Sequence, residues 1–538
     1  MTPSALGEEN AATGNPNIAA RLLESAHAYP DRDAIVAYRS GRPRRITYGA
    51  FVRHVAAVAA GLAERGIAPG DSVLLFVPMS IDLYVVLLAI HHLGATAVFL
   101  DAWAGRKRLE VAIRAARPQA FVGSPRAHLL RITSPALRAI PRSIVVGRGW
   151  SSDRLARPAD ARPPARVAPE APALVTFTTG TTGVPKAAVR SHAFLWAQHL
   201  ALHDHLRLRP EDVDLAMLPV FALSNFAVGC TTVIPEFDPR RPAEIDPQVI
   251  HRQMLAEAVT TTTGSPAFFE NLATWCRDTG QRLHVRALHT GGAPVLPPLA
   301  RLLTSTVTGE VHVVYGSTEA EPIAGIEARA MLGAMEEEGE GLCVGMPVQS
   351  IRLKIVRPWD SPIELGRGGW EPWELALGHV GEIVVTGNHV LPGYAGDLEA
   401  ERANKVRDGD QLWHRTGDAG RLDAQGRLWL MGRIRSRVVR DGVTWWGLPA
   451  EIRALELPTV RHAAYVGRPD ARMGQRAALC VETGSNDADD TLRSLLADAV
   501  APYPMDEMHA FAHLPRDPRH RSKTDTGALL EQLGRRPR

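Results

Sequence analysis

The segment that most constrains the fold is an apolar stretch that turns abruptly into a loop of small residues and ends on a lysine. Residues 173–177 suit a buried strand, and they run into Thr178-Thr179-Gly180-Thr181-Thr182-Gly183-Val184-Pro185-Lys186. Gly180 and Gly183 allow positive φ and a close backbone approach to an anion. The threonine hydroxyls add hydrogen-bond donors, and Lys186 adds a compact positive charge. This order predicts a phosphate-binding loop after a strand, although it lacks the Gly-x-x-x-x-Gly-Lys-Ser/Thr pattern of P-loop enzymes.

Helix-like and strand-like segments alternate before and after this loop. An amphipathic helix is expected at 47–65, a buried strand at 71–77, an apolar helix at 81–93 and a strand at 97–100. Such β-α-β alternation is typical of a parallel sheet covered by helices. Further helices are expected at 17–28, 194–206 and near 226–232.

The pattern changes after residue 350, where shorter strands are expected at 351–356, 381–386 and 427–430. An insertion at 357–378 contains three tryptophans, Trp359, Trp370 and Trp373, which we expect to anchor it by packing. We therefore expect an α/β fold with a large N-terminal domain of parallel-rich sheets covered by helices and a small, mobile C-terminal α+β domain. The expected boundaries are a flexible tail at 1–16, the large domain at 17–434 and a lid domain at 435–538.

Charge and cysteine content exclude several classes of protein. The 61 basic and 58 acidic residues give a net charge of +3 without a long block of one sign, which argues against a nucleic-acid stripe and a polybasic membrane anchor. The four cysteines lack metal-binding spacing. No secretory start is present, and the longest apolar run, 83–90, is too short to span a membrane. We expect a cytoplasmic protein with no nucleic-acid partner and no transmembrane segment.

Three further motifs follow the Thr-Gly loop in order. They are Thr290-Gly291-Gly292-Ala293-Pro294, Tyr315-Gly316-Ser317-Thr318-Glu319, and His414-Arg415-Thr416-Gly417-Asp418 with a later Gly432-Arg433 pair. A glycine pair lets a flat base lie against bare backbone, and a carboxylate such as Asp418 can accept both vicinal hydroxyls of a ribose. A loop at the carboxyl end of a strand is also where doubly wound folds bind ligands.

Together these motifs resemble the adenylate-forming superfamily of acyl-CoA synthetases, peptide-synthetase adenylation domains and luciferases. The resemblance covers most of residues 17–530 and implies ATP as cosubstrate with Mg²⁺. It implies that the β- and γ-phosphates are held by Thr178, Thr179, Gly180, Thr181, Thr182, Gly183 and Lys186. It implies that adenine lies against Gly291, Gly292, Ala293 and Pro294 and that Tyr315, followed by Gly316, stacks on it. In the same way, Thr318 would contact the α-phosphate, Glu319 would hold the metal, and Asp418 and Arg433 would contact the ribose or phosphate.

The C-terminal segment Pro515-Arg516-Asp517-Pro518-Arg519-His520-Arg521-Ser522-Lys523 narrows the resemblance. Its spacing is similar to that of the olefin-pathway β-lactone synthetases rather than to the common Pro-Arg-Thr-x-x-Gly-Lys form. The resemblance implies that the Lys523 ammonium bridges the attacking carboxylate and the α-phosphate, which lowers their mutual repulsion. The catalytic residues expected are Lys523, Glu319, Thr318 and Lys186.

The expected reaction is ATP-dependent adenylation of a 3-hydroxy carboxylic acid, followed by intramolecular closure to a β-lactone with release of AMP and pyrophosphate. The alternative is an AMP-forming acyl-CoA synthetase that makes a CoA thioester from a fatty acid. Gly442 favours this alternative because it matches a glycine beside the pantetheine tunnel, whereas Ala222 replaces the histidine of that subfamily. A third hypothesis, an inactive nucleotide-binding scaffold, conflicts with the joint presence of Lys186, Glu319, Asp418 and Lys523.

The acid, and other enzymes of the same pathway, are the expected partners. Motif position assigns the acyl pocket to Phe221, Leu223, Asn225, Phe226 and Ser265. Three histidines, His192, His289 and His520, are candidate bases for lactone closure, although a structural role is the first expectation for each. The hinge of the lid domain aligns with Arg435. Chain length and pathway are left open by the sequence.

Overall fold

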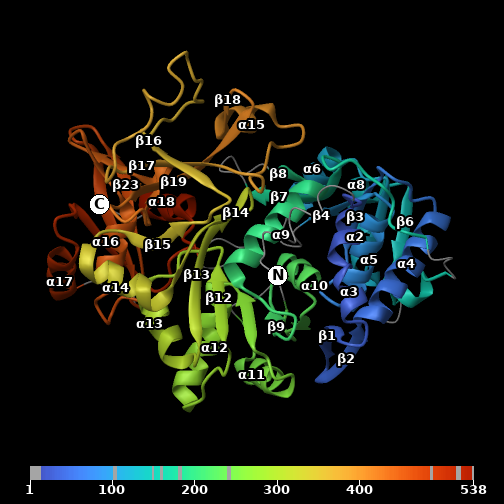
Figure 1. The fold of residues 1–538 in the computed structure, drawn as a ribbon. Coiled ribbons are helices and arrows are strands. Elements are labelled where there is room, and N and C mark those ends of the chain that lie inside the picture. The colour runs from blue at the N-terminus through green and yellow to red at the C-terminus, as the bar shows by residue number, and fades with distance from the viewer. Residues whose placement is uncertain are drawn as a thin grey trace. The chain divides into compact units, whose positions relative to one another are not determined.

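The structure is a computed structural model that describes residues 14–100, 106–147, 151–157, 162–179, 185–238, 244–484, 489–516 and 523–535. It has the predicted α/β fold (Figure 1). The chain forms two compact units: unit 1 comprises Met1–Pro239, Gln253–Thr263 and Leu391–Glu401, and unit 2 comprises Arg240–Arg252, Gly264–Val390 and Arg402–Arg538. The boundary expected at residue 434 stays a prediction. Residues 1–13 of the expected tail lie outside the described residues.

One sheet of unit 1 has six strands in the order β6-β5-β3-β4-β7-β8. Its strands are β3 (Ser72–Phe76), β4 (Thr96–Phe99), β5 (Ala120–Gly123), β6 (Arg142–Val145), β7 (Pro172–Thr179) and β8 (Pro185–Ser191). Neighbouring strands pair in parallel except β8, which returns antiparallel to β7. This arrangement confirms the expected β-α-β topology and places the Thr-Gly loop in the connection from β7 to β8.

A second set of paired strands in unit 1 comes from three parts of the sequence. They are β1 (Asp33–Arg39), β2 (Arg42–Thr47), β9 (Val213–Ala216), β10 (Thr231–Ile234) and β11 (Thr261–Gly264). β11, β9, β10 and β1 run parallel, and β2 forms a hairpin with β1. The helices of unit 1 are α2 (Ile18–Leu22), α3 (Ser25–Ala28), α4 (Tyr48–Glu64), α5 (Ile81–His92), α6 (Arg106–Ala116), α7 (Pro125–Thr133), α8 (Pro135–Arg138), α9 (His192–Leu206) and α10 (Pro219–Val228), with the short η1 (Ser152–Arg154). Helices α11 (Pro247–Ala256) and α15 (Leu398–Asn404) contain residues of both units.

Most of the helices expected in unit 1 are confirmed, with two differences. α4 begins after Thr47, whose hydroxyl accepts a hydrogen bond from the backbone N–H of Ala50. The helix expected at 17–28 is divided into α2 and α3. The helix expected near 226–232 is wrong, because α10 ends where Gly229 adopts a φ of 85° and the chain continues into β10. Within the described ranges, no helix is long and apolar enough to cross a membrane.

Unit 2 is built largely on an antiparallel arrangement. Its largest set of paired strands follows the order β16-β17-β19-β20-β15-β14-β13-β12, with β18 beside β19. These strands are β12 (Ala287–Gly291), β13 (Glu310–Ser317), β14 (Ala320–Glu327), β15 (Leu342–Pro347), β16 (Arg352–Val356), β17 (Gly381–Thr386), β18 (Lys405–Asp408), β19 (Gln411–Leu422) and β20 (Leu428–Arg433). The shorter strands expected after residue 350 are therefore confirmed as β16, β17 and β20. The helices are α12 (Pro266–Thr279), α13 (Pro297–Thr306) and α14 (Ala328–Glu338).

Residues beyond β20 form a smaller sheet with its own apolar clusters. The strands are β21 (Val438–Arg440), β22 (Val443–Trp445), β23 (His462–Asp470), β24 (Gly474–Glu482) and β25 (Glu507–Phe511), and the helices are η2 (Ile434–Ser436), α16 (Gly447–Ala454), α17 (Asp490–Val500) and α18 (Thr526–Arg535). β24 pairs antiparallel with β23 and parallel with β25. This α+β organisation agrees with the expected character of the C-terminal region.

The tryptophans of the insertion at 357–378 pack as expected. Trp370 meets Trp413 of β19 edge to face, with 5.4 Å between ring centroids, and Trp359 meets Trp373 in the same way at 5.7 Å. The Arg357 guanidinium lies over the Trp373 ring at 4.3 Å. The insertion is therefore fixed to the sheet by aromatic contacts.

Candidate active site

The strands that flank the Thr-Gly loop place Lys186 at its end. In the β7–β8 hairpin, Thr178 pairs with Lys186 and Thr179 pairs with Pro185. Gly180, Thr181, Thr182 and Gly183 lie outside the described residues. The Lys186 side chain is buried, and its ammonium lies 5.2 Å from the centroid of the Tyr394 ring. The aromatic face of Tyr394 thus helps to position the ammonium group.

Three residues predicted to contact the nucleotide meet in unit 2. The Tyr315 hydroxyl donates to Asp418 Oδ2 at 2.8 Å, and Arg433 Nη1 lies 3.1 Å from Asp418 Oδ1. Asp418 and Arg433 are cross-strand partners on β19 and β20, so the sheet register fixes this pair. The backbone N–H of Asp418 donates to the Thr416 hydroxyl. Motifs separated by more than a hundred residues therefore form one hydrogen-bonded cluster.

Burial raises the pKa of Tyr315 well above its ordinary value, and the Asp418 carboxylate adds to the shift. The phenol therefore stays protonated at neutral pH and acts as the donor in its bond to Asp418. One carboxylate oxygen of Asp418 is held by a neutral hydroxyl and the other by a guanidinium. This arrangement fixes the carboxylate orientation before any ligand binds.

The two glycines at the end of β12 serve different backbone requirements. Gly291 pairs with Val314 of β13, and a Cβ at Gly291 would lie only 2.4 Å from the Val314 carbonyl oxygen. Gly292 adopts a φ of 84°, which a residue with a side chain rarely takes. Since Val314 precedes Tyr315, the bare backbone at Gly291 is adjacent to the predicted adenine contact. Ala293 and Pro294 follow in the connection to α13.

Thr318 and Glu319 form the turn between β13 and β14. Gly316 allows this turn, because a Cβ there would lie 2.9 Å from the Ala320 carbonyl oxygen. Glu319 is half-buried, and its backbone N–H donates to the Ser317 hydroxyl. Among the described residues, no three His, Cys, Asp or Glu side chains gather into a metal-binding group. Glu319 still suits Mg²⁺, which commonly takes only one or two protein carboxylates and completes its shell with phosphate oxygens and water.

Lys523 is the first described residue after residues 517–522, which lie outside the described part of the chain together with His520. The backbone of Arg516 bridges that of Thr524, and the Asp525 N–H donates to the Pro515 carbonyl. The two ends of the predicted lysine loop are thus held together. Arg516 is itself tied to Glu482 of β24, with 3.3 Å between Nη2 and Oε2.

The structure gives the other two candidate bases structural surroundings. His192 is fully buried, and its Nδ1 accepts a hydrogen bond from the Ile18 N–H at 3.0 Å. Burial lowers the pKa of His192 to about 4, so the ring is neutral. His289 is buried and stacks on His312, with ring centroids 5.0 Å apart. His192 therefore uses its lone pair to anchor α2 rather than to accept a substrate proton.

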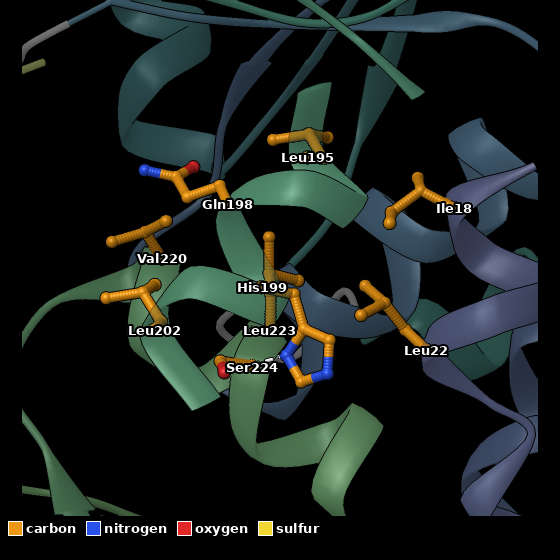
Figure 2. Close-up of a pocket in the computed structure, with 9 residues that line it drawn as sticks. All are labelled: Ile18, Leu22, Leu195, Gln198, His199, Leu202, Val220, Leu223 and Ser224. Carbon is orange, nitrogen blue, oxygen red and sulfur yellow. Dashed lines mark hydrogen bonds between the residues drawn. The ribbon is translucent and has the colours of Figure 1, made fainter. Parts of the chain in front are cut away.

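Helix α10 separates the predicted acyl-pocket residues onto two faces. Val220, Leu223 and Ser224, at i, i+3 and i+4, line a small pocket, where the Ser224 hydroxyl lies 2.9 Å from Nδ1 of His199 (Figure 2). Ile18, Leu22, Leu195 and Leu202 form the apolar part of the lining. Burial lowers the pKa of His199 to about 3, so its imidazole is neutral.

The opposite face of α10 is part of the core, which the assignment by motif position missed. Asn225 is fully buried, and its amide donates to Asp214 Oδ2 at 2.9 Å. Phe226 is also fully buried and packs against Phe51 and Tyr84. Helical periodicity, applied to residues 219–228, would have distinguished the two faces. Elsewhere, Phe221 packs in an apolar cluster with Leu202, and the Ser265 hydroxyl caps α12.

Two further carboxylates near Asp418 have partners that sequence reasoning missed. Arg415 forms a buried ion pair with Glu382 and donates to the carbonyls of Trp359 and Ser361, so it ties the insertion to β17. Asp423 directly follows β19, and its Oδ2 accepts from the buried Trp429 indole at 2.7 Å. The pairing of Arg415 with Glu382, 33 positions away, carries no local sequence signal.

Comparisons with known proteins agree with this geometry. The chain is 34% identical to an olefin beta-lactone synthetase of Stenotrophomonas maltophilia, covering 94% of this chain and 96% of that protein. It is 33% identical to the olefin beta-lactone synthetase of Xanthomonas campestris, covering 89% of each. ATP-bound MatB from Rhodopseudomonas palustris shares the fold, with a TM-score of 0.80, 23% identity and coverage of 97% of this chain and 99% of that one. Residues 22–395 match the family described as AMP-binding enzyme, and the chain belongs to that family.

Proposed function

We propose that this enzyme activates a 3-hydroxy carboxylic acid with ATP and closes it to a β-lactone, releasing pyrophosphate and then AMP. The observation that carries the proposal is the nucleotide cluster of Tyr315, Asp418 and Arg433 beside the bare backbone of Gly291. The choice of product is supported by the similarity to olefin beta-lactone synthetases over almost the whole chain.

In the first step, a carboxylate oxygen of the acid attacks the α-phosphorus of ATP, and the bond to pyrophosphate breaks. Asp418 accepts hydrogen bonds from the ribose hydroxyls, and Thr318 contacts the α-phosphate. Lys186 and the hydroxyls of the Thr-Gly loop hold the departing phosphates, while Lys523 offsets the repulsion between the two anions. Glu319 is the residue that would hold Mg²⁺, which supplies positive charge to the phosphate oxygens.

In the second step, the 3-hydroxyl oxygen of the same chain attacks the activated carbonyl carbon. As the new carbon–oxygen bond forms, the hydroxyl proton passes to water, the bond from the carbonyl carbon to the AMP oxygen breaks, and AMP leaves as the four-membered ring closes. Holding both groups on one molecule removes the entropy cost of a second encounter, but ring strain demands a good leaving group. Adenylation supplies that leaving group. We place the acid's chain along the Val220, Leu223 and Ser224 face of α10.

The deciding experiment incubates the purified protein with ATP, Mg²⁺ and a panel of 3-hydroxy acids, with and without CoA, and identifies products by mass spectrometry. We expect AMP, pyrophosphate and a product that has lost one water relative to the acid, independent of CoA. The matched control is the same acid without its 3-hydroxyl, which should yield adenylate but no lactone. A Lys523→Ala variant should lose adenylate formation. A CoA thioester without lactone would contradict the proposal.

The backbone around Gly442 is compatible with the alternative function, an acyl-CoA synthetase, so the assay must test for it. Gly442 adopts a φ of 78° between β21 and β22, and a Cβ there would have no atom within 4 Å, so the backbone is open on that side. That suits the glycine which borders a CoA tunnel. In contrast, Ala222 is fully buried where acyl-CoA synthetases present a histidine. The arm of the assay without CoA distinguishes the two reactions directly.

A further inference from the structure

One surface of unit 1 combines exposed apolar side chains with arginines, and the proposed reaction does not use it. On α7, Leu129 is 62% exposed, Ile132 is 71% exposed and Leu130 is 41% exposed. Single exposed leucines are ordinary, but three within four residues of one short helix form a patch that costs free energy in water. We call this surface, formed by Arg126, Leu129, Leu130 and Ile132 of α7 with Arg138 of α8, the α7 face.

The apolar and basic residues share one side of α7. The buried Ala127 and the half-buried His128, whose Nε2 contacts the Ile144 carbonyl at 3.0 Å, mark the inner side. Arg126 precedes Leu129 and Leu130 by three and four positions, so these three side chains are neighbours on the outer side. Cationic and apolar groups are therefore interleaved within the patch rather than divided into a core and a rim.

Neighbouring helices extend the positive charge. α8 contacts both α6 and α7, and Figure 1 shows α6 beside α8. Residues 110–147 contain six arginines and a single carboxylate, Glu110. That carboxylate is already engaged, because it accepts from the Ser134 hydroxyl and lies 3.5 Å from Arg114. In the described ranges, no acidic side chain pairs with Arg126 or Arg138.

We propose that the α7 face binds the surface of a membrane that contains anionic lipids. A bilayer offers negative headgroups with an apolar layer directly beneath, which matches arginines interleaved with leucine and isoleucine. A second copy of this chain is a poorer occupant, because a two-fold interface pairs the α7 face with itself and this face offers no carboxylate to Arg126 or Arg138. A protein partner would favour an apolar centre with charges at the rim, which the α7 face lacks.

The test measures flotation of the purified full-length protein with vesicles of phosphatidylcholine alone and of phosphatidylcholine mixed with phosphatidylglycerol in equal amounts. We expect binding only to the mixed vesicles. It should weaken as salt rises from about 0.1 M to about 1 M, because the Debye length falls from about 10 Å to about 3 Å. The Arg126→Gln/Arg138→Gln variant should lose roughly thirtyfold in vesicle affinity. The Leu129→Ser/Ile132→Ser variant should lose roughly tenfold or more.

The matched control is Arg493→Gln/Leu495→Ser on α17, where Leu495 is 50% exposed and Arg493 is also at the surface. This variant should bind the mixed vesicles like the unmodified protein. The proposal would be overturned if the unmodified protein did not float with the mixed vesicles, or if both α7 variants bound them as tightly as the unmodified protein does. It would also be overturned if the α17 control lost as much affinity as the α7 variants. A different result would also contradict it: the unmodified protein binds no vesicles and forms an oligomer, and the Leu129→Ser/Ile132→Ser variant has a lower mass. The α7 face would then join two copies of the chain.

Discussion

Replacing Tyr315 by phenylalanine separates the expected stacking of the ring on adenine from the hydrogen bond of the hydroxyl to Asp418. The variant keeps the ring that is expected to stack on adenine and removes only the hydroxyl that holds Asp418 Oδ2 at 2.8 Å. A hydrogen bond to a charged group contributes about 1.5–3 kcal/mol, but Arg433 continues to hold the other carboxylate oxygen. We therefore expect a loss of about 1–2 kcal/mol in ATP binding, which is about a 5- to 30-fold rise in the KM for ATP.

The assay is exchange of labelled pyrophosphate into ATP at saturating acid, with kcat and KM determined separately. Tyr465→Phe is the matched control, because its hydroxyl donates at the same distance of 2.8 Å to the Pro504 carbonyl in the C-terminal region. If Tyr315 acts by orienting Asp418, adding Tyr315→Phe to Asp418→Asn should cost little more than Asp418→Asn alone. A KM for ATP within twofold of the unmodified enzyme, or fully additive effects, would refute the reasoning.

Three further predictions concern stability and use urea unfolding. Asp423→Ala should cost about 1.5–3 kcal/mol, because it strips the buried Trp429 indole of its acceptor and removes one of the two carboxylates that pair with Arg427, which keeps Glu338. Asp470→Ala, which breaks a surface ion pair with Arg476, should cost less. Burial acts to raise the pKa of Asp423, but hydrogen bonds from Trp429 and Arg427 outweigh it, so the pKa lies below its usual range. The stability that the Asp423 carboxylate contributes is therefore present above about pH 4 and is lost as the pH falls further. Glu382→Ala should cost about 3–5 kcal/mol by leaving the Arg415 charge buried, and Glu382→Ala/Arg415→Ala should recover part of it. The pKa of His192 is depressed to about 4, so the neutral ring contributes its full share to the free energy of unfolding above about pH 6.5. That free energy should fall by about 2 kcal/mol at about pH 5, and His192→Asn should reduce its dependence on pH in this range.

The nucleotide cluster could be predicted because its residues lie in short motifs with fixed internal spacing. Tyr315, Asp418 and Arg433, which the resemblance assigned to one nucleotide site, do meet, because they lie on β13, β19 and β20 of one sheet. Their contacts with a nucleotide stay a prediction. The α/β organisation was predictable for a similar reason, because apolar runs of strand and helix length alternate along the chain. The contribution of Lys523 stays a prediction, with residues 517–522 outside the described part of the chain.

Other features depend on which elements pack together, and no local pattern records that. Arg415 lies in a predicted motif, yet its partner Glu382 is 33 positions away and the ion pair forms only because β17 pairs with β19. From the sequence alone His192 is a candidate base, but its Nδ1 accepts a hydrogen bond from the Ile18 N–H of α2, which no local pattern predicts. Motif position assigned Phe221, Leu223, Asn225 and Phe226 to one pocket together with Ser265, although the 3.6-residue period of a helix places Leu223 and Asn225 on different faces of α10.

The two faces of α10 bear on how this scaffold can diversify. Stability depends on Ala222, Asn225 and Phe226, whereas the pocket lining depends on Val220, Leu223 and Ser224, and the two sets alternate in the same ten residues. Leu223 and Ser224 are nevertheless buried, and Leu223 packs in the same core cluster as Ala222 and Phe226. Only the half-buried Val220 can therefore vary widely without loss of packing. One face of a single helix thus ties any change in the shape of the pocket to the stability of the core.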